Sequence, residues 1–319
     1  MKKYIFNILL VGLLFLGPLY ALQTIVDSRA RRNYLNNQYR TLNTALEKKV
    51  DADVVIFGNS RVLNHFDTQV MDSVLSVKCF NMGLPGFPFD IQYHLVIKPY
   101  LHNNKPPKLI IYEISPYTCL EHCNPIYQNI FMPYINSRYY DYYMEICDEI
   151  SEIDRYLPFK YRGRKFHSFY QELTGPFGPD QGKDSFTPFP MNGYKKNFME
   201  GQDSVYAIER NPQIVSQLRE FVKACKKKNV ELLFVTTPMH EEDFYNHCHT
   251  EEFLSMVDTI SNWTNRFNYS LMFHSDTTFF AEPTHLNALG AKVFSKKFAE
   301  DVKSEYGSLL SEMSSQSHF

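Results

Sequence analysis

The chain has 319 residues, enough to bury one sizeable hydrophobic core, or one core with a large insertion. It holds 33 Lys and Arg against 35 Asp and Glu, which gives a formal net charge of -2 at pH 7. This balance gives no reason to expect a nucleic-acid partner, because nucleic acids are bound through clusters of positive charge. Composition therefore leaves enzymatic functions and other kinds of binding open.

The amino terminus predicts a membrane anchor. Lys2 and Lys3 precede an uncharged, mostly apolar run over residues 4–22, close to the roughly 20 residues that span a bilayer core. The run is longer than the roughly 7–15 apolar residues of a cleaved signal peptide, and no small residue stands two positions before Ala21. We expect residues 1–22 to be an uncleaved anchor, with a cleaved signal peptide as the alternative. A short basic tail favours a single-pass protein of the bacterial inner membrane, with its folded part facing the periplasm.

The next segments predict a stalk followed by an α/β domain. Residues 23–50 are polar, with Leu42 and Leu46 at helical spacing, and are interpreted as a helical stalk. Over residues 51–305, short apolar runs alternate with helical patterns, which is typical of a mainly parallel sheet. Residues 306–319 form a tail. The predicted strands are Val54–Phe57, Val77–Asn81, Lys108–Ile114, Glu231–Thr236 and Leu271–His274.

Two helices of this domain have clear apolar faces. The first begins after Asn211 and Pro212, which suit a helix cap and first helical position. The last begins after Asn287. The expected buried positions are Ile214, Leu218, Phe221, Val222 and Cys225 in the first, and Val293, Phe294, Phe298 and Val302 in the last.

An aromatic-rich insertion at residues 116–210 separates the third and fourth predicted strands. Apolar residues from Tyr139 to Leu157 repeat at helical spacing, whereas residues 175–193 are rich in Gly and Pro and predict a loop. We interpret the insertion as a lid or subdomain over the carboxyl edge of the sheet, where ligands bind in such folds. The alternative is that its aromatic residues form a small local core.

Two motifs at opposite ends of the chain indicate acyl-ester chemistry. Gly58-Asn59-Ser60-Arg61 follows the first predicted strand and precedes a helix, so the Ser60 hydroxyl is expected at the mouth of the sheet. Glu282-Pro283-Thr284-His285 places a carboxylate three residues before an imidazole that it can orient. Together they predict a catalytic triad of Ser60, His285 and Glu282.

With these motifs, the chain resembles the SGNH (GDSL-type) hydrolase superfamily over residues 51–115 and 229–305. The resemblance implies a three-layer α/β/α fold with a mainly parallel sheet, a Ser60 nucleophile and a His285 base. It also implies that the backbone N–H groups of Ser60 and Gly83 hold the oxyanion. Glu282 stands where the family has aspartate, and Asp276 is the alternative acid.

The chain departs from the family at its third motif, where an asparagine normally donates to the oxyanion. Here the strand ends in Glu113-Ile114-Ser115-Pro116, so Ser115, another backbone N–H or no group fills that role. The anchored layout resembles an outlying branch that holds alginate O-acetylation and teichoic-acid D-alanylation proteins. That branch implies transfer or removal of O-acyl groups, acetyl above all, on an envelope polysaccharide, beside a multispanning membrane acyltransferase. The sequence does not choose between a serine esterase and an O-acyltransferase.

Three alternatives stay open. Arg61 either meets an anionic substrate or is structural. A cluster from His240 to His249 carries zinc-ligand residue types, but its spacing favours a solvated acidic loop, and no metal or cofactor is predicted. Finally, the chain is either an enzyme or a non-catalytic protein of the same fold that binds or scaffolds an envelope glycan.

Overall fold

The computed structural model describes residues 1–47, 50–119, 130–131, 133–134, 137–146, 174, 178, 182–191, 193–195, 213–243 and 251–311. The chain divides into two compact units. One consists of Met1–Asn43 with Cys123–Lys183, and the other of Thr44–His122 with Asp184–Phe319. The predicted insertion at residues 116–210 is therefore divided between them: residues 123–183 belong to the first unit, and the parts before and after them belong to the second.

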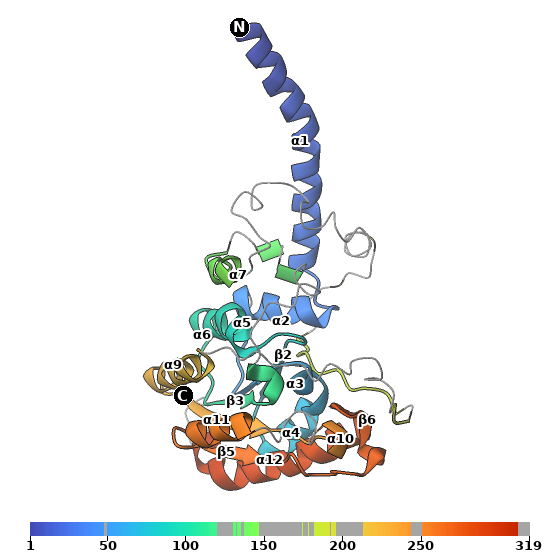
Figure 1. Cartoon of the computed structure of the whole chain (residues 1–319), viewed down its shortest axis with the longest axis vertical. Helices are drawn as coiled ribbons and strands as arrows, with labels where there is room; N and C mark the ends of the chain where they lie inside the picture. The colour runs from blue at the N-terminus through green and yellow to red at the C-terminus, as the bar shows by residue number, and fades with distance from the viewer. Residues whose placement is uncertain are drawn as a thin grey trace, which may run out of the picture. The chain divides into compact units, whose positions relative to one another are not determined.

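The second unit is built on a parallel five-stranded sheet with the strand order β2-β1-β3-β4-β5. Figure 1 labels β2, β3 and β5 of this sheet. A separate antiparallel pair, β6 and β7, precedes the last helix. The strands are β1 (Val54–Gly58), β2 (Cys79–Gly83), β3 (Leu109–Glu113), β4 (Glu231–Thr236), β5 (Arg266–Asn268), β6 (Phe280–Glu282) and β7 (His285–Leu286).

Helices of this unit connect the strands. They are α3 (Ser60–His65), α4 (Thr68–Leu75), α5 (Phe89–Gln92), α6 (Lys98–Asn103), α9 (Ile214–Lys227), α10 (Glu241–Asp243), α11 (Glu251–Ser261) and α12 (Ala288–Ser311). Shorter turns are the π-helix η1 (Tyr93–Ile97) and the 3-10 helices η2 (Pro116–Cys119) and η8 (Thr277–Phe279). The remaining described helices are α1 (Lys2–Arg31), α2 (Asn37–Leu46) and α7 (Asp141–Ile146).

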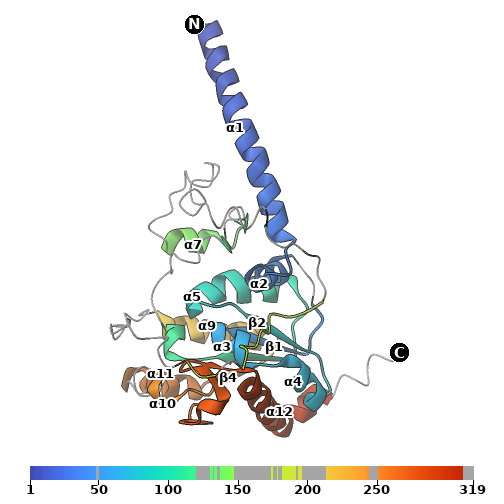
Figure 2. The ribbon, with the colours of Figure 1, turned by 90° about the vertical axis from the view of Figure 1, so that its right-hand side faces the viewer.

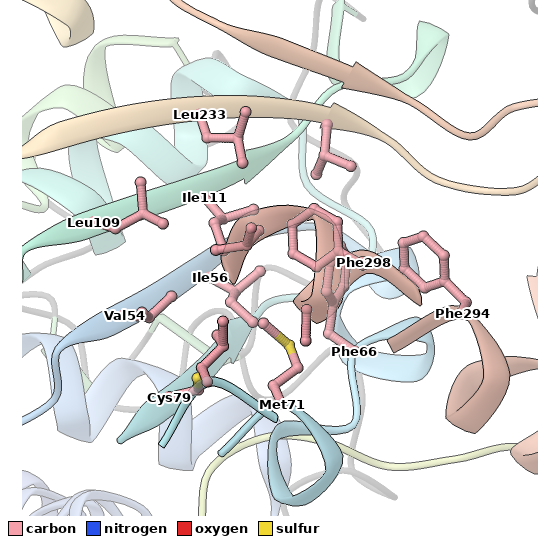
Figure 3. Packing of buried hydrophobic residues seen from close by; sticks show 14 of the residues in the cluster. Val54, Ile56, Phe66, Met71, Cys79, Leu109, Ile111, Leu233, Phe294 and Phe298 are labelled. Atoms are coloured by element: carbon pink, nitrogen blue, oxygen red, sulfur yellow. The ribbon is translucent and has the colours of Figure 1, made fainter. Parts of the chain in front are cut away.

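Helices cover both faces of the sheet, which explains why β1, β2 and β3 are buried along their whole length. Side chains alternate along a strand, so Val54 and Ile56 of β1 join α4 and α12 in one core (Figure 3). On the other face Phe57 packs edge-on against Tyr100 of α6. Figure 2 shows α5 on one side of the sheet and α4 and α12 on the other.

Four of the five predicted strands are present, with ends shifted by no more than two residues. The fifth prediction, Leu271–His274, was wrong: these residues form turns, and Phe273 has a φ of 71°. The edge strand is β5 instead, and its residues are half-buried or exposed. A short, incompletely buried edge strand lacks the apolar run on which the prediction depended.

Both predicted helices are present as α9 and α12. All five residues of the predicted α9 face are buried, whereas Asn211 and Pro212 lie outside the described residues. In α12, Phe294, Phe298 and Val302 are fully buried, but Val293 is 38% exposed. Val293 is one position from Phe294, and a step of one residue turns the side chain about 100° around a helix.

The predicted anchor lies in α1. This helix is long and apolar enough to cross a membrane, and no other helix in the described part of the chain is. The helix continues to Arg31, nine residues past the predicted boundary, and α2 follows in the predicted stalk with Leu42 buried. In the insertion, α7 carries the first part of the predicted helix; the part from residue 147 onward lies outside the described residues.

Candidate active site

Ser60 lies where β1 turns into α3, at the carboxyl edge of the sheet. It is the first residue of α3, and the Asn59 side chain caps the helix by accepting the Arg61 N–H at 2.9 Å. The turn requires glycine at Gly58, because its φ is 154° and an added Cβ would lie 2.5 Å from Val62 Cγ2. Local backbone geometry therefore places the serine hydroxyl at the end of the strand.

The strand order makes this end of β1 a special place in the sheet. From β1 the chain crosses to β2 on one side, and β3 then lies on the other side of β1. Ligands bind outside the carboxyl ends of the strands at such a change of direction. Ser60 is therefore at the position where this type of sheet forms a binding crevice.

The structure brings Ser60, His285 and Glu282 together. The His285 Nε2 atom lies 2.7 Å from Ser60 Oγ, although the two residues are 225 positions apart. Its Nδ1 atom is hydrogen-bonded to the Glu282 carboxylate. A carboxylate only accepts, so Nδ1 carries the proton and Nε2 is the acceptor for the serine hydroxyl.

Thr284 completes the environment of the carboxylate. Its hydroxyl donates to Glu282 Oε1 at 2.6 Å, and its backbone N–H donates to Oε2 at 3.3 Å. Burial raises the pKa of Glu282, but the hydrogen bond and charge of His285 and the two bonds from Thr284 more than offset this. The pKa ends below its ordinary value, so the carboxylate beside His285 is ionised at neutral pH.

The alternative acid, Asp276, does not lie in this hydrogen-bonded chain. Its exposed carboxylate accepts the Thr278 N–H at 3.0 Å and caps η8. Of the two candidates, the structure places Glu282 on the imidazole.

Of the two predicted oxyanion donors, Gly83 does not fit. Its N–H donates to Asn81 Oδ1 at 2.9 Å, so it is occupied within the fold. Gly83 instead lets α3 approach β2, since an added Cβ would lie 2.5 Å from the Leu63 backbone nitrogen. The Ser60 N–H precedes the first intrahelical bond and makes no hydrogen bond to another described residue. It is the predicted donor that stays available.

Arg61, the candidate contact to an anionic substrate, and Ser115, the candidate third oxyanion donor, both lie in the interior. Arg61 is 1% exposed, with its guanidinium over the Tyr117 ring, which agrees with the structural alternative. Ser115 is fully buried; its N–H donates to Thr118 Oγ1 and its hydroxyl to Glu113 Oε2. The serine that follows β3 thus joins a buried polar cluster rather than the surface beside Ser60.

Two residues that motif analysis missed hold the site in place. His65, at the end of α3, accepts the Leu286 N–H at its Nε2 atom at 3.0 Å. Asn81 donates to the carbonyl oxygens of Val62 and Phe66 and so joins β2 to the same helix. A histidine and an asparagine near the first two motifs were the only sequence signals, and neither has a diagnostic spacing.

The cluster that begins at His240 contributes structure to the same edge. The His240 N–H donates to the Pro283 carbonyl at 3.2 Å, and Tyr194 OH lies 3.2 Å from its Nδ1 atom. Residues 244–250, which include His247, Cys248 and His249 of this cluster, lie outside the described residues. Within the part of the chain that the structure describes, no group of three His, Cys, Asp or Glu side chains is arranged to hold a metal ion.

No protein-family model matches the chain, and no curated protein matches its sequence. One similar solved structure is that of a proposed acylhydrolase from Bacteroides fragilis, with a TM-score of 0.36 and 11% sequence identity. The likeness covers 85% of this chain and 99% of that one. A likeness this low carries no argument about activity, so the case for a function depends on the geometry of the site.

Proposed function

We propose that this chain is a serine acyl-ester enzyme whose nucleophile is Ser60, whose base is His285 and whose orienting acid is Glu282. One observation carries the proposal: an unbroken chain of hydrogen bonds from Ser60 Oγ through His285 to Glu282, at the carboxyl edge of a parallel sheet. Serine is a weak nucleophile unless a base takes its proton, and this arrangement provides the base in the required tautomer.

The reaction would proceed in two steps. Ser60 Oγ attacks the ester carbonyl while His285 Nε2 takes the hydroxyl proton, and the Ser60 N–H donates to the developing oxyanion. When the tetrahedral intermediate collapses, the carbon–oxygen bond to the alcohol breaks and the imidazolium returns the proton to that alcohol. A second hydroxyl, of water or of a sugar, then attacks the acyl-enzyme with His285 again as the base; the bond between the acyl carbon and Ser60 Oγ breaks, and the imidazolium returns the proton to Ser60.

The wider setting is part of the proposal. We assign the α/β unit to the SGNH type, with three layers, on the strength of the motifs around Ser60 and His285. The apolar α1 supports a single-pass anchor in a bacterial inner membrane, with the enzyme on the periplasmic side. The substrate would then be an O-acylated, in particular O-acetylated, envelope polysaccharide, with a multispanning acyltransferase as a partner if the reaction is a transfer.

A non-catalytic glycan-binding or scaffolding role is the second candidate. It is favoured by one observation, that the Gly83 N–H is occupied by Asn81 and leaves one predicted oxyanion donor fewer. Losing a single such donor typically costs a factor of about 100–1,000 in turnover, which weakens catalysis without abolishing it.

The deciding experiment is labelling of the full-length protein in detergent with a fluorophosphonate probe, which reacts with activated serines. We expect the wild type to be labelled, Ser60→Ala and His285→Ala to be unlabelled, and Glu282→Gln to react on the order of 10,000-fold more slowly. Asp276→Asn is the matched control and should be labelled at the wild-type rate. A folded wild-type protein that takes no label would favour the non-catalytic role.

A further inference from the structure

A segment of the insertion, residues 184–191, lies against the candidate site; we call it the strap. Its first half is tied to β2 and α3 by backbone hydrogen bonds: Ser185 N–H donates to the Asn81 carbonyl at 3.0 Å, and Thr187 N–H to the Leu63 carbonyl at 2.9 Å. The Asn64 side-chain amide donates a hydrogen bond to the Thr187 carbonyl at 2.7 Å. The strap is thus fixed to the helix that carries Ser60.

The second half of the strap is tied to the segment that carries the histidine. The Phe189 carbonyl accepts the Ala288 N–H at 2.9 Å, and Phe189 forms an isolated parallel bridge with Asn287. These two partners follow His285 by only two and three positions. The strap is therefore bonded to β2 and α3 before Phe189 and to residues 287–288 at Phe189, which fixes the position of Phe189 relative to His285.

The Phe189 ring faces the His285 ring. Their centroids are 5.3 Å apart and their planes are inclined by 49°. Phe189 keeps 36% of its surface exposed, although it packs beside a histidine whose own side chain is only 16% exposed. An apolar aromatic surface is thus left open immediately beside the proposed base.

Resting on the proposed function, we propose that Phe189 forms the subsite for the alcohol part of the ester. His285 Nε2 must return its proton to the departing alcohol, and in the second step take one from the incoming hydroxyl, so that alcohol lies next to the imidazole. The Phe189 ring, which lies against that imidazole, belongs to a residue that keeps 36% of its surface exposed. It suits an alcohol with an extended apolar face, such as a pyranose ring, over a small alkyl alcohol.

The test separates the alcohol subsite from the triad by changing the leaving group. Two acetates share one acyl group: methyl 6-O-acetyl-glucopyranoside and ethyl acetate. In the full-length protein, Phe189→Ala should lower kcat/KM for the sugar acetate about tenfold and leave that for ethyl acetate within about twofold. Labelling by a fluorophosphonate, whose leaving group is fluoride, should also stay within about twofold of the wild-type rate.

Met191→Ala is the matched control, because Met191 lies on the same strap and is 63% exposed. Met191→Ala should leave kcat/KM for both acetates within about twofold of the wild-type value. Phe189→Leu retains apolar bulk without a flat ring; it should show the same selective loss, to a smaller degree, and guards against a folding defect in the alanine variant.

Equal losses with both acetates, or slower labelling of Phe189→Ala, would mean that Phe189 only positions His285 and would overturn the inference. An effect of Met191→Ala as large as that of Phe189→Ala would overturn it as well. Both outcomes are read only when the wild-type protein is labelled. If the wild type takes no label, the proposed function is wrong, and the inference about Phe189 is wrong with it.

Discussion

At the scale of single residues, His65 joins the two halves of the proposed triad. It lies on α3, the helix that begins with Ser60, and its Nε2 atom accepts the N–H of Leu286, the neighbour of His285. Because Nε2 accepts, the neutral ring carries its proton on Nδ1, which has no hydrogen-bond partner among the described residues. One helix thereby carries the proposed nucleophile and holds the backbone next to the proposed base.

His65 should make the fold sensitive to mild acid. Burial first, and then the charges of Arg61 and His285, hold the pKa of His65 well below its usual 6.5. As pH falls through about 6.5 the unfolded chain binds a proton that the folded chain does not. The free energy of unfolding therefore keeps its full value above that pH and decreases progressively as the pH falls below it. His65→Gln keeps an acceptor for the Leu286 N–H but does not titrate.

We therefore expect the unfolding midpoint of His65→Gln to fall less than that of the wild type between pH 7.5 and pH 5. Thermal unfolding at a series of pH values measures this. His102→Gln, the same substitution at an exposed histidine, is the control and should follow the wild type. Identical slopes for His65→Gln and the wild type would show that His65 is not the source of the acid sensitivity.

At the scale of elements, the contact between α3 and β2 decides where Ser60 lies. Gly83 permits it, since a Cβ there would stand 2.5 Å from the Leu63 nitrogen and 2.9 Å from its Cα. Both are backbone atoms, so no side-chain rotation can relieve the overlap. Asn81 then joins the strand to the far end of the helix.

Gly83→Ala should lower the free energy of unfolding by about 1–3 kcal/mol and slow fluorophosphonate labelling, because α3 must move and Ser60 moves with it. Gly307→Ala is the matched control. Its nearest neighbour atom would be 3.9 Å away, and alanine in a helix interior should raise the free energy of unfolding by about 0.5–1 kcal/mol. Denaturant unfolding of both variants measures the difference; a Gly83→Ala protein as stable and reactive as the wild type would contradict the role given to this glycine.

At the scale of the whole molecule, α1 is long and apolar enough to cross a membrane. Most of the described apolar side chains in its first part are exposed, with Leu13 exposed by 70%, whereas Val26 and Ala30 near its end are buried. A contiguous exposed apolar surface of this kind is typical of a site that contacts a membrane or another protein.

Leu13→Arg should release part of the protein from the membrane, because an arginine at the centre of a spanning helix costs about 2.5–3.5 kcal/mol of insertion free energy. Ile25→Arg is the control. It lies past the apolar run, where the long side chain can reach the interface, and should remain with the membrane. Alkaline carbonate extraction of membranes, followed by immunoblotting, measures the retained fraction. Equal retention of both variants would argue against α1 as a spanning anchor.

The sequence predicted those features that depend only on the pattern of residues within one short segment. Apolar runs that are covered on both faces predicted β1 to β4, and a helical apolar stripe predicted α9. The weak edge strand β5 was missed because its residues are incompletely buried. Ser60, Glu282 and His285 could be proposed because each stands in a short motif with a chemical meaning.

The tertiary structure decided whatever depends on residues distant in sequence. It brings His285 within hydrogen-bond distance of Ser60, 225 positions away in the sequence. It shows that Glu282, rather than Asp276, is hydrogen-bonded to the imidazole. It also assigned the Gly83 N–H to Asn81, His65 to Leu286 and the Phe189 ring to His285. A local pattern shows which side chains are apolar or reactive, but the partner of a hydrogen bond is set by how the chain packs. Only the folded sheet edge, where four distant segments meet, determines those partners.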